Sequence, residues 1–412
     1  MTASTAAGAQ TSMQLKVYCA GRCGEAVTSS SNLPSPFGAF ILLHRLGRGG
    51  MGEVFLASRG APGALLGLGI TKLTVVKMLR PELSEDKEYV RRFIDEAGIV
   101  VHLNHRDICQ VHDVGKLGNT YFLAMEYIAG RDLKDLVERA TAAHRPLPES
   151  VALYIVRELL EALDYAHKLA DANGEPLHLV HRDISPRNIM IALEGDVKLI
   201  DFGLAASRLK QSMTEPSFVM GKIAYMPPEQ ARHEPVDART DIFAAGVVAY
   251  ELLTGTRYYD GLSADEMWAR AGTGGHLPKR LADMPPDLGL IVRRALAADR
   301  EQRWPSAAAF RRELEAYEGG GQQASQRDVR ALMHALFADD ERKARELLTE
   351  LTRIASIVDS QLEDPLAPTS TQVIATRTGS FSSQSSSVPA FTAVAPTDAV
   401  APHDPTIETD TE

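Results

Sequence analysis

The hydrophobic pattern divides the chain into a strand-rich stretch followed by a helix-rich one. Between residues 37 and 125, short apolar runs bounded by glycine and polar residues predict strands, and one longer stretch with helical spacing predicts a helix. The expected strands cover residues 40–46, 53–57, 74–79, 111–114 and 121–126, and the expected helix covers 85–103. One helix among five strands indicates a small, mostly antiparallel lobe.

Helical spacing dominates beyond Gly130. Ser150 is a candidate N-cap for a helix whose apolar face includes Val151, Ile155 and Leu159. Further helices are expected at residues 239–253, 264–271, 287–296 and 306–317. After a glycine-rich linker at 319–325, apolar residues at helical spacing predict a helical extension at 326–362. We expect this extension either to pack back on the preceding domain or to mediate a homodimer.

The two ends of the chain have compositions typical of flexible segments. Residues 1–36 are rich in Ala, Ser, Thr and Gly, and residues 363–412 are rich in Ser, Thr and Pro and carry acidic side chains. We therefore expect a flexible leader and a disordered tail. No apolar run approaches the roughly 18 residues that a membrane span needs, and the first residues lack the pattern of a signal peptide. These features predict a cytoplasmic location and no membrane partner.

Composition excludes several classes of function. The chain of 412 residues is 44% hydrophobic and 24% charged, which is typical of globular proteins. Its formal net charge of −10 argues against nucleic acid as a partner. Three cysteines are too few for a disulfide framework. Cys19 and Cys23 could form half of a metal site, but no second pair of ligands lies nearby in the sequence, so we do not expect one.

A glycine-dense turn, Gly47-Arg-Gly-Gly-Met-Gly52, follows the first predicted strand. Glycines at such spacing let the backbone approach an anion and present N–H groups to phosphate. A dinucleotide-binding fold would continue into a helix, whereas residues 53–57 predict a strand, so that fold is excluded. A glycine turn between two strands, followed by Val54 and by Lys77 in a third strand, is typical of the nucleotide-binding part of a protein kinase.

Later motifs match the same family in the same order. They are Glu96 in the predicted helix, His181-Arg182-Asp183-Ile-Ser-Pro-Arg-Asn188, Asp201-Phe202-Gly203 and Pro227-Pro228-Glu229. From about Leu43 to Leu314 the chain resembles a bacterial eukaryotic-like (Hanks-type) serine/threonine protein kinase, and its texture is most similar to soluble myxobacterial kinases. The resemblance implies an α+β bilobal protein kinase fold over residues 37–318. Its parts would be an N-lobe with a five-stranded antiparallel sheet and helix C (37–125), a hinge (126–130) and a mostly helical C-lobe (131–318).

The resemblance also assigns a role to each motif. Asp183 would be the catalytic base, Lys77 would hold the α and β phosphates of ATP and pair with Glu96, and Asn188 and Asp201 would bind Mg²⁺. The residues implied in ATP binding are Leu46, Gly47, Arg48, Gly49, Gly50, Met51, Gly52, Glu53, Val54, Val75, Lys77, Glu126, Ile128, Asp132 and Met190, with Met125 as gatekeeper and Ile200 behind the purine.

Three further implications concern single residues. Asp132 matches a position that often contacts ribose, and its alternative role is a solvated aspartate at a helix start. Glu229 would pair with Arg303 in a buried ion pair. Asp241, together with Gly246 on the same predicted helix, would anchor the catalytic loop.

Two positions depart from the family pattern. Ser185 stands where serine/threonine kinases usually have a lysine that steadies the γ phosphate, and we expect Arg187 to take over that charge, although a guanidinium and an ammonium are not equivalent. Lys222 replaces a threonine in the substrate-docking segment. Residues 224–229 nevertheless resemble the serine/threonine version more than the tyrosine version.

The expected function is transfer of the γ-phosphoryl group of Mg·ATP to Ser or Thr hydroxyls of proteins. We also expect autophosphorylation at Thr214 or Ser217, where a phosphate would pair with Arg182. A serine cluster at 380–387 is a second candidate. Two alternatives remain, a pseudokinase, suggested by the departures at Ser185 and Lys222, and an interaction scaffold that uses the helix at 326–362 as its contact surface.

Overall fold

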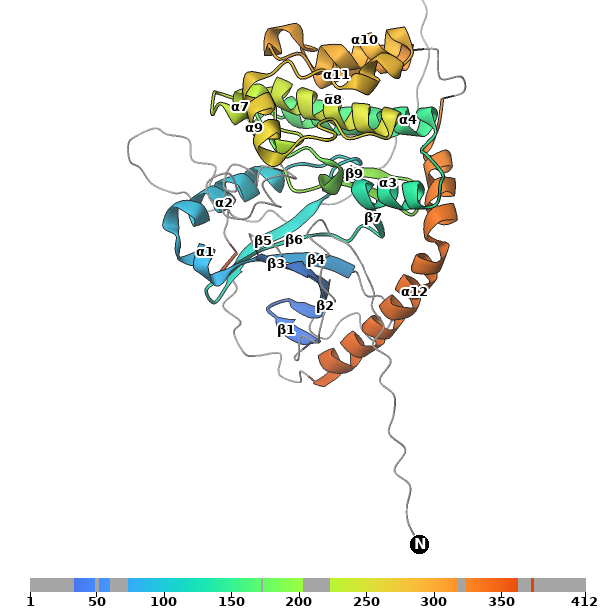
Figure 1. Cartoon of the computed structure of the whole chain (residues 1–412). Helices are drawn as coiled ribbons and strands as arrows, with labels where there is room; N and C mark the ends of the chain where they lie inside the picture. The colour runs from blue at the N-terminus through green and yellow to red at the C-terminus, as the bar shows by residue number, and fades with distance from the viewer. Residues whose placement is uncertain are drawn as a thin grey trace, which may run out of the picture. The chain divides into compact units, whose positions relative to one another are not determined.

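The computed structural model describes residues 33–48, 52–59, 73–171, 173–202, 223–317, 323–361 and 372–373. The described elements belong to a unit that extends to Ile374, with an N-lobe built on a sheet and a C-lobe built of helices (Figure 1). The expected leader up to residue 32, the core of the linker at 319–325 and most of the expected tail lie outside the described residues.

The N-lobe sheet is antiparallel throughout and contains the five strands predicted from the sequence. In spatial order they are β2 (Phe40–Arg48), β3 (Gly52–Arg59), β4 (Leu73–Leu79), β6 (Thr120–Glu126) and β5 (Val111–Leu117). Two further strands lengthen the sheet at its edges, β1 (Ser35–Phe37) beside β2 and β10 (Gln372–Val373) beside β5. The sheet therefore includes the last residues of the segment expected to be a flexible leader, and two residues of the segment expected to be a disordered tail.

Alternation along the strands gives this sheet two apolar faces. One face packs against helix α2 (Lys87–Val100) and includes Val75, while the opposite face forms a smaller cluster that includes Val76. In the smaller cluster, Phe122 contacts Phe37 and Phe40 edge to face, at centroid distances of 5.3 and 5.7 Å. The contact between Phe37 and Phe122 explains why β1 joins the sheet.

The helix expected at 85–103 is α2, and a short helix that was not predicted, α1 (Pro81–Glu85), precedes it. Asp86 has extended backbone angles (φ −79°, ψ 105°) and ends α1. Its carboxylate accepts a hydrogen bond from the backbone N–H of Tyr89, which satisfies a donor in the first turn of α2. This break at Asp86 separates α2, the helix expected to carry Glu96, from α1.

The C-lobe surrounds two buried helices, α4 (Glu149–His167) and α8 (Ala238–Thr254). α8 is buried on nearly all sides, which accounts for the apolar character of its central residues. A Cβ at Gly246 would lie 2.8 Å from the Cβ of Ala295, so glycine is required where α8 crosses α10. The remaining described helices are α3 (Leu133–Ala142), α7 (Pro228–Ala231), α9 (Ala264–Thr273), α10 (Pro286–Ala295) and α11 (Ala307–Ala316).

A small second sheet lies beneath the N-lobe and carries the catalytic segments. Its strands are β7 (Gly130–Asp132), β8 (Ile189–Ala192) and β9 (Val197–Leu199), paired antiparallel in that order. A Cβ at Gly130 would lie 2.1 Å from the carbonyl oxygen of Ile191, so this position requires glycine at the end of the hinge. None of these three short strands was predicted from the sequence.

The expected N-cap at Ser150 is wrong. α4 begins at Glu149, its N-cap is Pro148, and the backbone N–H of Ala152 donates to the carbonyl of Pro148. Ser150 therefore lies within the first turn. The four residues of α7 are too few to show a clear apolar period, so it was not predicted, and for α3 only a possible start at Asp132 was expected.

The helical extension is α12 (Gln326–Gln361), and it packs back on the preceding domain, one of the two outcomes expected for it. Val329, Met333 and Phe337 are completely buried. Figure 1 shows α12 leaving the C-lobe beside α3 and α4 and running toward β1 and β2. No helix in the described part of the chain has both the length and the apolar character required to cross a bilayer.

Candidate active site

The glycine turn joins β2 to β3, and Gly49, Gly50 and Met51 lie outside the described residues. A Cβ at Gly52 would fall 1.6 Å from the carbonyl oxygen of Met78, so the close approach of β3 to β4 requires glycine there. Glu53 forms ion pairs with Arg45 (3.1 Å) and Arg48 (3.9 Å). These pairs join the two strands where the turn begins and ends.

A cavity between the lobes contains many of the residues assigned to ATP. It is lined by Val54, Val75, Lys77, Cys109, Met125, Glu126, Ile128, Met190, Ile200 and Asp201. Leu46 is buried in the adjoining apolar cluster without lining this cavity. Cys109 was missed by the sequence analysis, because it precedes β5 and only the fold brings it to the cavity wall.

The hinge strand is fixed by hydrogen bonds from both lobes. The Glu126 carboxylate accepts from the Lys198 ammonium (2.8 Å) and from the backbone N–H of Gln110 (2.9 Å). The hydroxyl of Thr74 donates to the carbonyl of Met125 at 2.7 Å. The backbone N–H and C=O of Ile128 make no hydrogen bond to any residue in the described ranges. They are therefore available to hydrogen-bond the edge of a planar ligand in the cavity that carries an acceptor and a donor.

Lys77 and Asp201 form a direct ion pair in this structure. The Lys77 ammonium lies 2.6 Å from Asp201 Oδ1, and the two side chains are only 13% and 8% exposed. Glu96, the expected partner of Lys77, is on α2, and its side chain is outside the described part of the chain. The pair brings together a cation suited to phosphate and a carboxylate suited to metal, from opposite lobes.

Asp241 anchors the catalytic loop, as the sequence analysis expected. Its completely buried carboxylate accepts hydrogen bonds from the backbone N–H groups of His181 and Arg182, each at 2.8 Å, and from Nε2 of His167 at 2.8 Å. Burial opposes ionisation of Asp241, but these hydrogen bonds and the neighbouring imidazoles outweigh it and hold its pKa below the ordinary value. The loop is thereby attached to α8.

His181 connects this anchor to the segment that carries Asp201. Its Nε2 lies 2.9 Å from the carbonyl oxygen of Ile200, and its ring contacts Phe202 edge to face at 4.6 Å. Arg182 and Asp201 have positive φ angles of 65° and 62°, a conformation that costs non-glycine residues of the order of 1–3 kcal/mol. The surrounding hydrogen bonds maintain this strained backbone at Arg182, which precedes the expected base Asp183, and at Asp201, the expected metal ligand.

The groups assigned to Mg²⁺ fit that ion by their donor atoms. Asn188 Nδ2 donates to the carbonyl of Asp183 at 2.6 Å, which leaves its amide oxygen as the ligand atom. Asp201 supplies a carboxylate on the adjoining segment. Mg²⁺ prefers such oxygen ligands, usually one or two from protein together with phosphate oxygens and water. The two residues are therefore suited to a metal that also binds phosphate.

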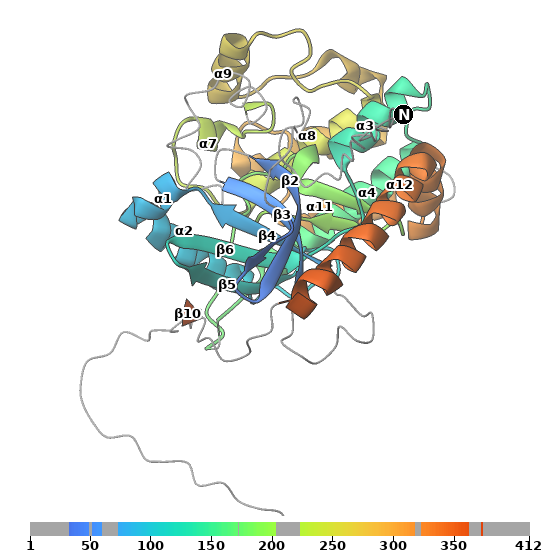
Figure 2. The same cartoon turned by 90° about the horizontal axis from the view of Figure 1, so that it is seen from below.

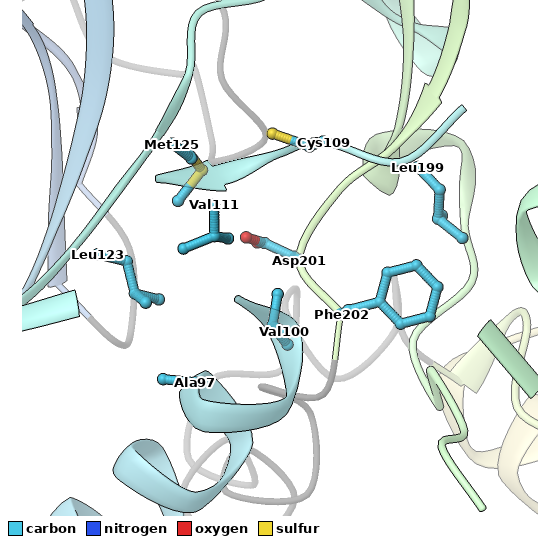
Figure 3. A pocket seen from close by; sticks show the side chains of 9 residues that line it. All are labelled: Ala97, Val100, Cys109, Val111, Leu123, Met125, Leu199, Asp201 and Phe202. Carbon is cyan, nitrogen blue, oxygen red and sulfur yellow. The ribbon is translucent and has the colours of Figure 1, made fainter. Parts of the chain in front are cut away.

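A second cavity adjoins the first behind Met125 (Figure 3). Its lining residues are Ala97, Val100, Cys109, Val111, Leu123, Met125, Leu199, Asp201 and Phe202. Figure 3 shows the Asp201 carboxylate pointing toward Val111, between the hinge strand and α2. This apolar surrounding limits access of water to the ion pair between Lys77 and Asp201 and so strengthens it.

Asp132 is the N-cap of α3, and it is not solvated. Its carboxylate accepts from the backbone N–H of Asp135 at 2.8 Å, and the residue is only 3% exposed. Burial raises the pKa of Asp132 to about 6. The expectation that Asp132 stands at the start of a helix is thus confirmed, whereas the expectation that its side chain is solvated is wrong.

We expect Asp132→Asn to stabilise the protein at neutral pH. Asp132 binds its proton more tightly when folded, so its contribution to stability is complete below its ordinary pKa and is lost as pH rises through about 6. Asparagine keeps the N-cap acceptor without the charge. Urea unfolding near about pH 8 should give a gain of up to about 3 kcal/mol, since one pKa unit corresponds to about 1.4 kcal/mol. A gain that persists undiminished near about pH 4 would contradict this explanation.

One of the two departures from the family pattern, Ser185, lies in the described part of the chain. Ser185 precedes a single 3₁₀ turn, Pro186–Asn188, in which Arg187 is exposed. The positive charge of Arg187 lowers the pKa of Asp132, although less than burial raises it. The assignment of Arg187 to the γ phosphate remains a prediction. Gly203, Lys222 and the expected autophosphorylation sites Thr214 and Ser217 are outside the described residues.

The substrate-docking segment is attached by the expected ion pair. Arg303 donates to both oxygens of Glu229 at 2.7 and 2.8 Å, and Thr240 donates to the same carboxylate at 2.9 Å. Both charged side chains are buried. A further bond, from the Tyr225 hydroxyl to the Glu251 carboxylate at 2.6 Å, was missed because nothing in either local sequence marks the other as a partner.

Comparisons with known proteins agree with this geometry. A family model described as "Protein kinase domain" matches residues 40–314. "Tyrosine-protein kinase MasK" of Myxococcus xanthus is 37% identical over 297 residues, which are 71% of this chain and 45% of that protein. "Serine/threonine-protein kinase PknB" of Mycobacterium leprae is 35% identical over 276 residues, which are 65% of this chain and 41% of that protein. The matched region thus spans less than half the length of either relative.

A solved structure shows the same fold. The crystal structure of the Mycobacterium tuberculosis PknI kinase domain matches with a TM-score of 0.51 and 28% identity. The match covers 69% of this chain and 98% of that domain. The expected bilobal arrangement, with a curled antiparallel sheet above a helical lobe, is therefore confirmed.

Proposed function

Because the chain belongs to the protein kinase family, we propose that it transfers the γ-phosphoryl group of ATP to Ser and Thr hydroxyls of proteins. The observations that support this proposal are that Lys77 and Asp201 meet in the wall of the cavity between the lobes, and that Asn188 bonds the carbonyl of Asp183 and the backbone N–H of Ile200, the residue before Asp201. Each of the four has the chemical character that phosphoryl transfer needs from it.

Each residue would contribute through position and charge. Lys77 would turn from Asp201 to the phosphates, and Asp183 would accept the proton of the attacking hydroxyl. Asn188 and Asp201 would hold Mg²⁺, which neutralises charge on the β and γ phosphates when bound. The hydrogen bonds of Asp241 and His181 keep the loop in place before substrate arrives, so little reorganisation is needed during the reaction.

The choice between Ser/Thr and Tyr rests on sequence and relatives. Residues 224–229 resemble the serine/threonine version of the docking segment, and PknB is named a serine/threonine kinase. Tyrosine is the second candidate, because MasK is named a tyrosine kinase and Arg187 stands where many tyrosine kinases have arginine. We propose Ser/Thr as the main acceptors.

Phosphoamino acid analysis tests this choice. The purified chain would be incubated with γ-labelled ATP, Mg²⁺ and a mixed protein substrate, beside Lys77→Met as the inactive control. We expect label in phosphoserine and phosphothreonine in the wild-type reaction only. Label mainly in phosphotyrosine would favour the second candidate, and equal label in both reactions would reject phosphoryl transfer.

We also expect autophosphorylation at Thr214 or Ser217. A phosphate there would add about −1.5 to −2 charge for Arg182 to bind. The Arg182 backbone is already fixed by Asp241 and by Gln230, whose amide donates to its carbonyl at 3.1 Å. Phosphopeptide mapping should find the modification, and the Thr214→Ala/Ser217→Ala variant should lose several-fold in activity toward added substrate. An unmodified loop in fully active protein would contradict this expectation.

A further inference from the structure

The first turns of α12 are attached to the C-lobe. The Gln326 amide donates to Asp196 Oδ1 at 2.8 Å and to the carbonyl of Glu194 at 3.2 Å, and Arg330 forms an ion pair with Glu194 at 3.0 Å. Val329 and Met333 are completely buried in the main apolar core. This end of α12 is therefore part of the C-lobe.

The middle of α12 contacts the residue that follows the hinge. The guanidinium groups of Arg131 and Arg139 lie 5.4 and 5.1 Å from the ring centroid of Phe337, which is 1% exposed. Asp340 Oδ2 lies 2.8 Å from Arg139 Nη2 and 3.7 Å from Arg131 Nη2. Arg131 in turn donates to the carbonyl of Gly130, the last hinge residue, at 3.0 Å.

Phe337 is also where α12 bends. Its backbone angles, φ −127° and ψ 17°, are not helical, so two straight segments meet there. The bend directs the second segment away from α3, and Figures 1 and 2 both show this segment ending beside β2. The attachment at Phe337 and Asp340 thus marks the passage of α12 from one lobe to the other.

The second segment reaches the N-lobe. α12 contacts β2, Leu351 is buried, and Leu347 and Leu348 pack against the same apolar core. A helix rises about 1.5 Å per residue, so the distance from Val329 to Leu351 is of the order of 30 Å, which is enough to cross from one lobe to the other. Between them the two segments contact both lobes and the end of the hinge.

We propose that α12 is an interlobe brace, which fixes the orientation of the N-lobe on the C-lobe and thereby raises the affinity of the cleft for nucleotide. Both lobes line the cavity, so only some lobe orientations bring the two walls to the right separation. When only a fraction of the molecules has a lobe orientation that can bind nucleotide, the apparent dissociation constant for nucleotide rises in inverse proportion to that fraction. Phe337 and Asp340 are positioning residues here, because they act on the hinge through Arg131.

The claim that α12 raises nucleotide affinity rests on the proposed function, whereas the claim that α12 fixes the orientation of the lobes does not. The test uses the full chain with Leu351→Asp, which places a charge in the apolar contact with the N-lobe while leaving Val329, Met333 and Phe337 in place. The matched control is Thr349→Asp, which introduces the same charge on the exposed side of the same turn. Leu351→Ala is a milder second variant, for use if the first does not fold.

Two measurements are made on each variant. Hydrogen exchange should become faster in β2 and in hinge residues 126–130 of the Leu351 variants, with exchange in α8 unchanged. The dissociation constant of a non-hydrolysable Mg·ATP analogue should rise about three- to ten-fold, which corresponds to a competent fraction reduced by the same factor. Thr349→Asp should leave both quantities at wild-type values.

The outcomes separate the brace from the function. Unchanged exchange in β2 and the hinge would overturn the brace. Faster exchange with an unaltered dissociation constant would overturn its effect on the nucleotide, leaving α12 a purely stabilising element. If the wild type binds no nucleotide, the proposed function fails, and the exchange measurement alone still decides whether α12 joins the lobes.

Discussion

Replacing Asp183 by asparagine is expected to lower phosphoryl transfer by at least about 100-fold, because a positioned general base typically contributes about 10²–10⁴-fold. The side-chain change keeps size and shape and removes only the basic oxygen. The backbone N–H of Asp183 donates to the ring Nδ1 of His181, and its carbonyl accepts from the side-chain amide of Asn188; neither bond uses a side-chain atom of Asp183, so both should persist. Nucleotide affinity and melting temperature should therefore stay near wild-type values.

The measurement is the initial rate with γ-labelled ATP, beside nucleotide titration and thermal unfolding. Asp283→Asn serves as the matched control, since it makes the same chemical change at an exposed ion pair with Arg280. The control should transfer phosphate at the wild-type rate. Near-normal transfer by Asp183→Asn would remove Asp183 from the role of base, and loss of folding would show that it is a structural residue instead.

Replacing Arg303 by leucine should cause the largest loss of stability, about 3–5 kcal/mol, because it leaves the buried Glu229 carboxylate without its cation. Arg303 also donates to the carbonyls of Ala297 and Arg239, which lose their donor as well. Chemical denaturation should show a lower midpoint with an unchanged slope. Arg232→Leu, which removes an exposed partner of Glu234, should cost no more than about 1 kcal/mol.

A double variant separates the ion pair from simple loss of packing. Arg303→Leu combined with Glu229→Leu removes the unpaired charge, so part of the stability lost in the single variant should return. A double variant as unstable as the sum of the single ones would contradict this explanation.

The ion pair between Arg303 and Glu229 also predicts that the protein loses stability in acid. Burial opposes ionisation of Glu229, but Arg303 outweighs it and lowers the pKa, so this stability is present above the ordinary pKa and is lost as pH falls through the lowered one.

The sequence predicted those features that depend on local pattern. The five strands of the N-lobe were found within a few residues, because their apolar runs end at glycine or polar residues. The motifs around Asp183 and Asp201 were found because phosphoryl transfer requires particular residue types in a fixed order. Asp241 and Arg303 followed from the family resemblance, and the structure gives them the expected partners.

Features that depend on contacts between distant segments were missed. β1 forms because Phe37 packs on Phe122, and the periodicity of residues 35–37 alone is too short to indicate a strand. The helical period of 326–362 predicted α12, whereas the bend at Phe337 and the contact with Arg131 depend on the surface that the C-lobe presents. The direct pair between Lys77 and Asp201 likewise joins a strand of the N-lobe to a segment of the C-lobe that follows β9.

We propose that Lys77, Asp183, Asn188 and Asp201 form one working site for phosphoryl transfer. Intact-mass measurement tests it most directly, after incubating the purified wild-type chain with ATP and Mg²⁺, with ATP and a chelator, and in parallel with the Lys77→Met variant. We expect mass to be added in steps of one phosphoryl group to the wild-type chain with Mg²⁺ and in neither control. Equal gain in the Lys77→Met variant, or no gain by the wild-type chain together with no transfer to added protein substrate, would contradict it.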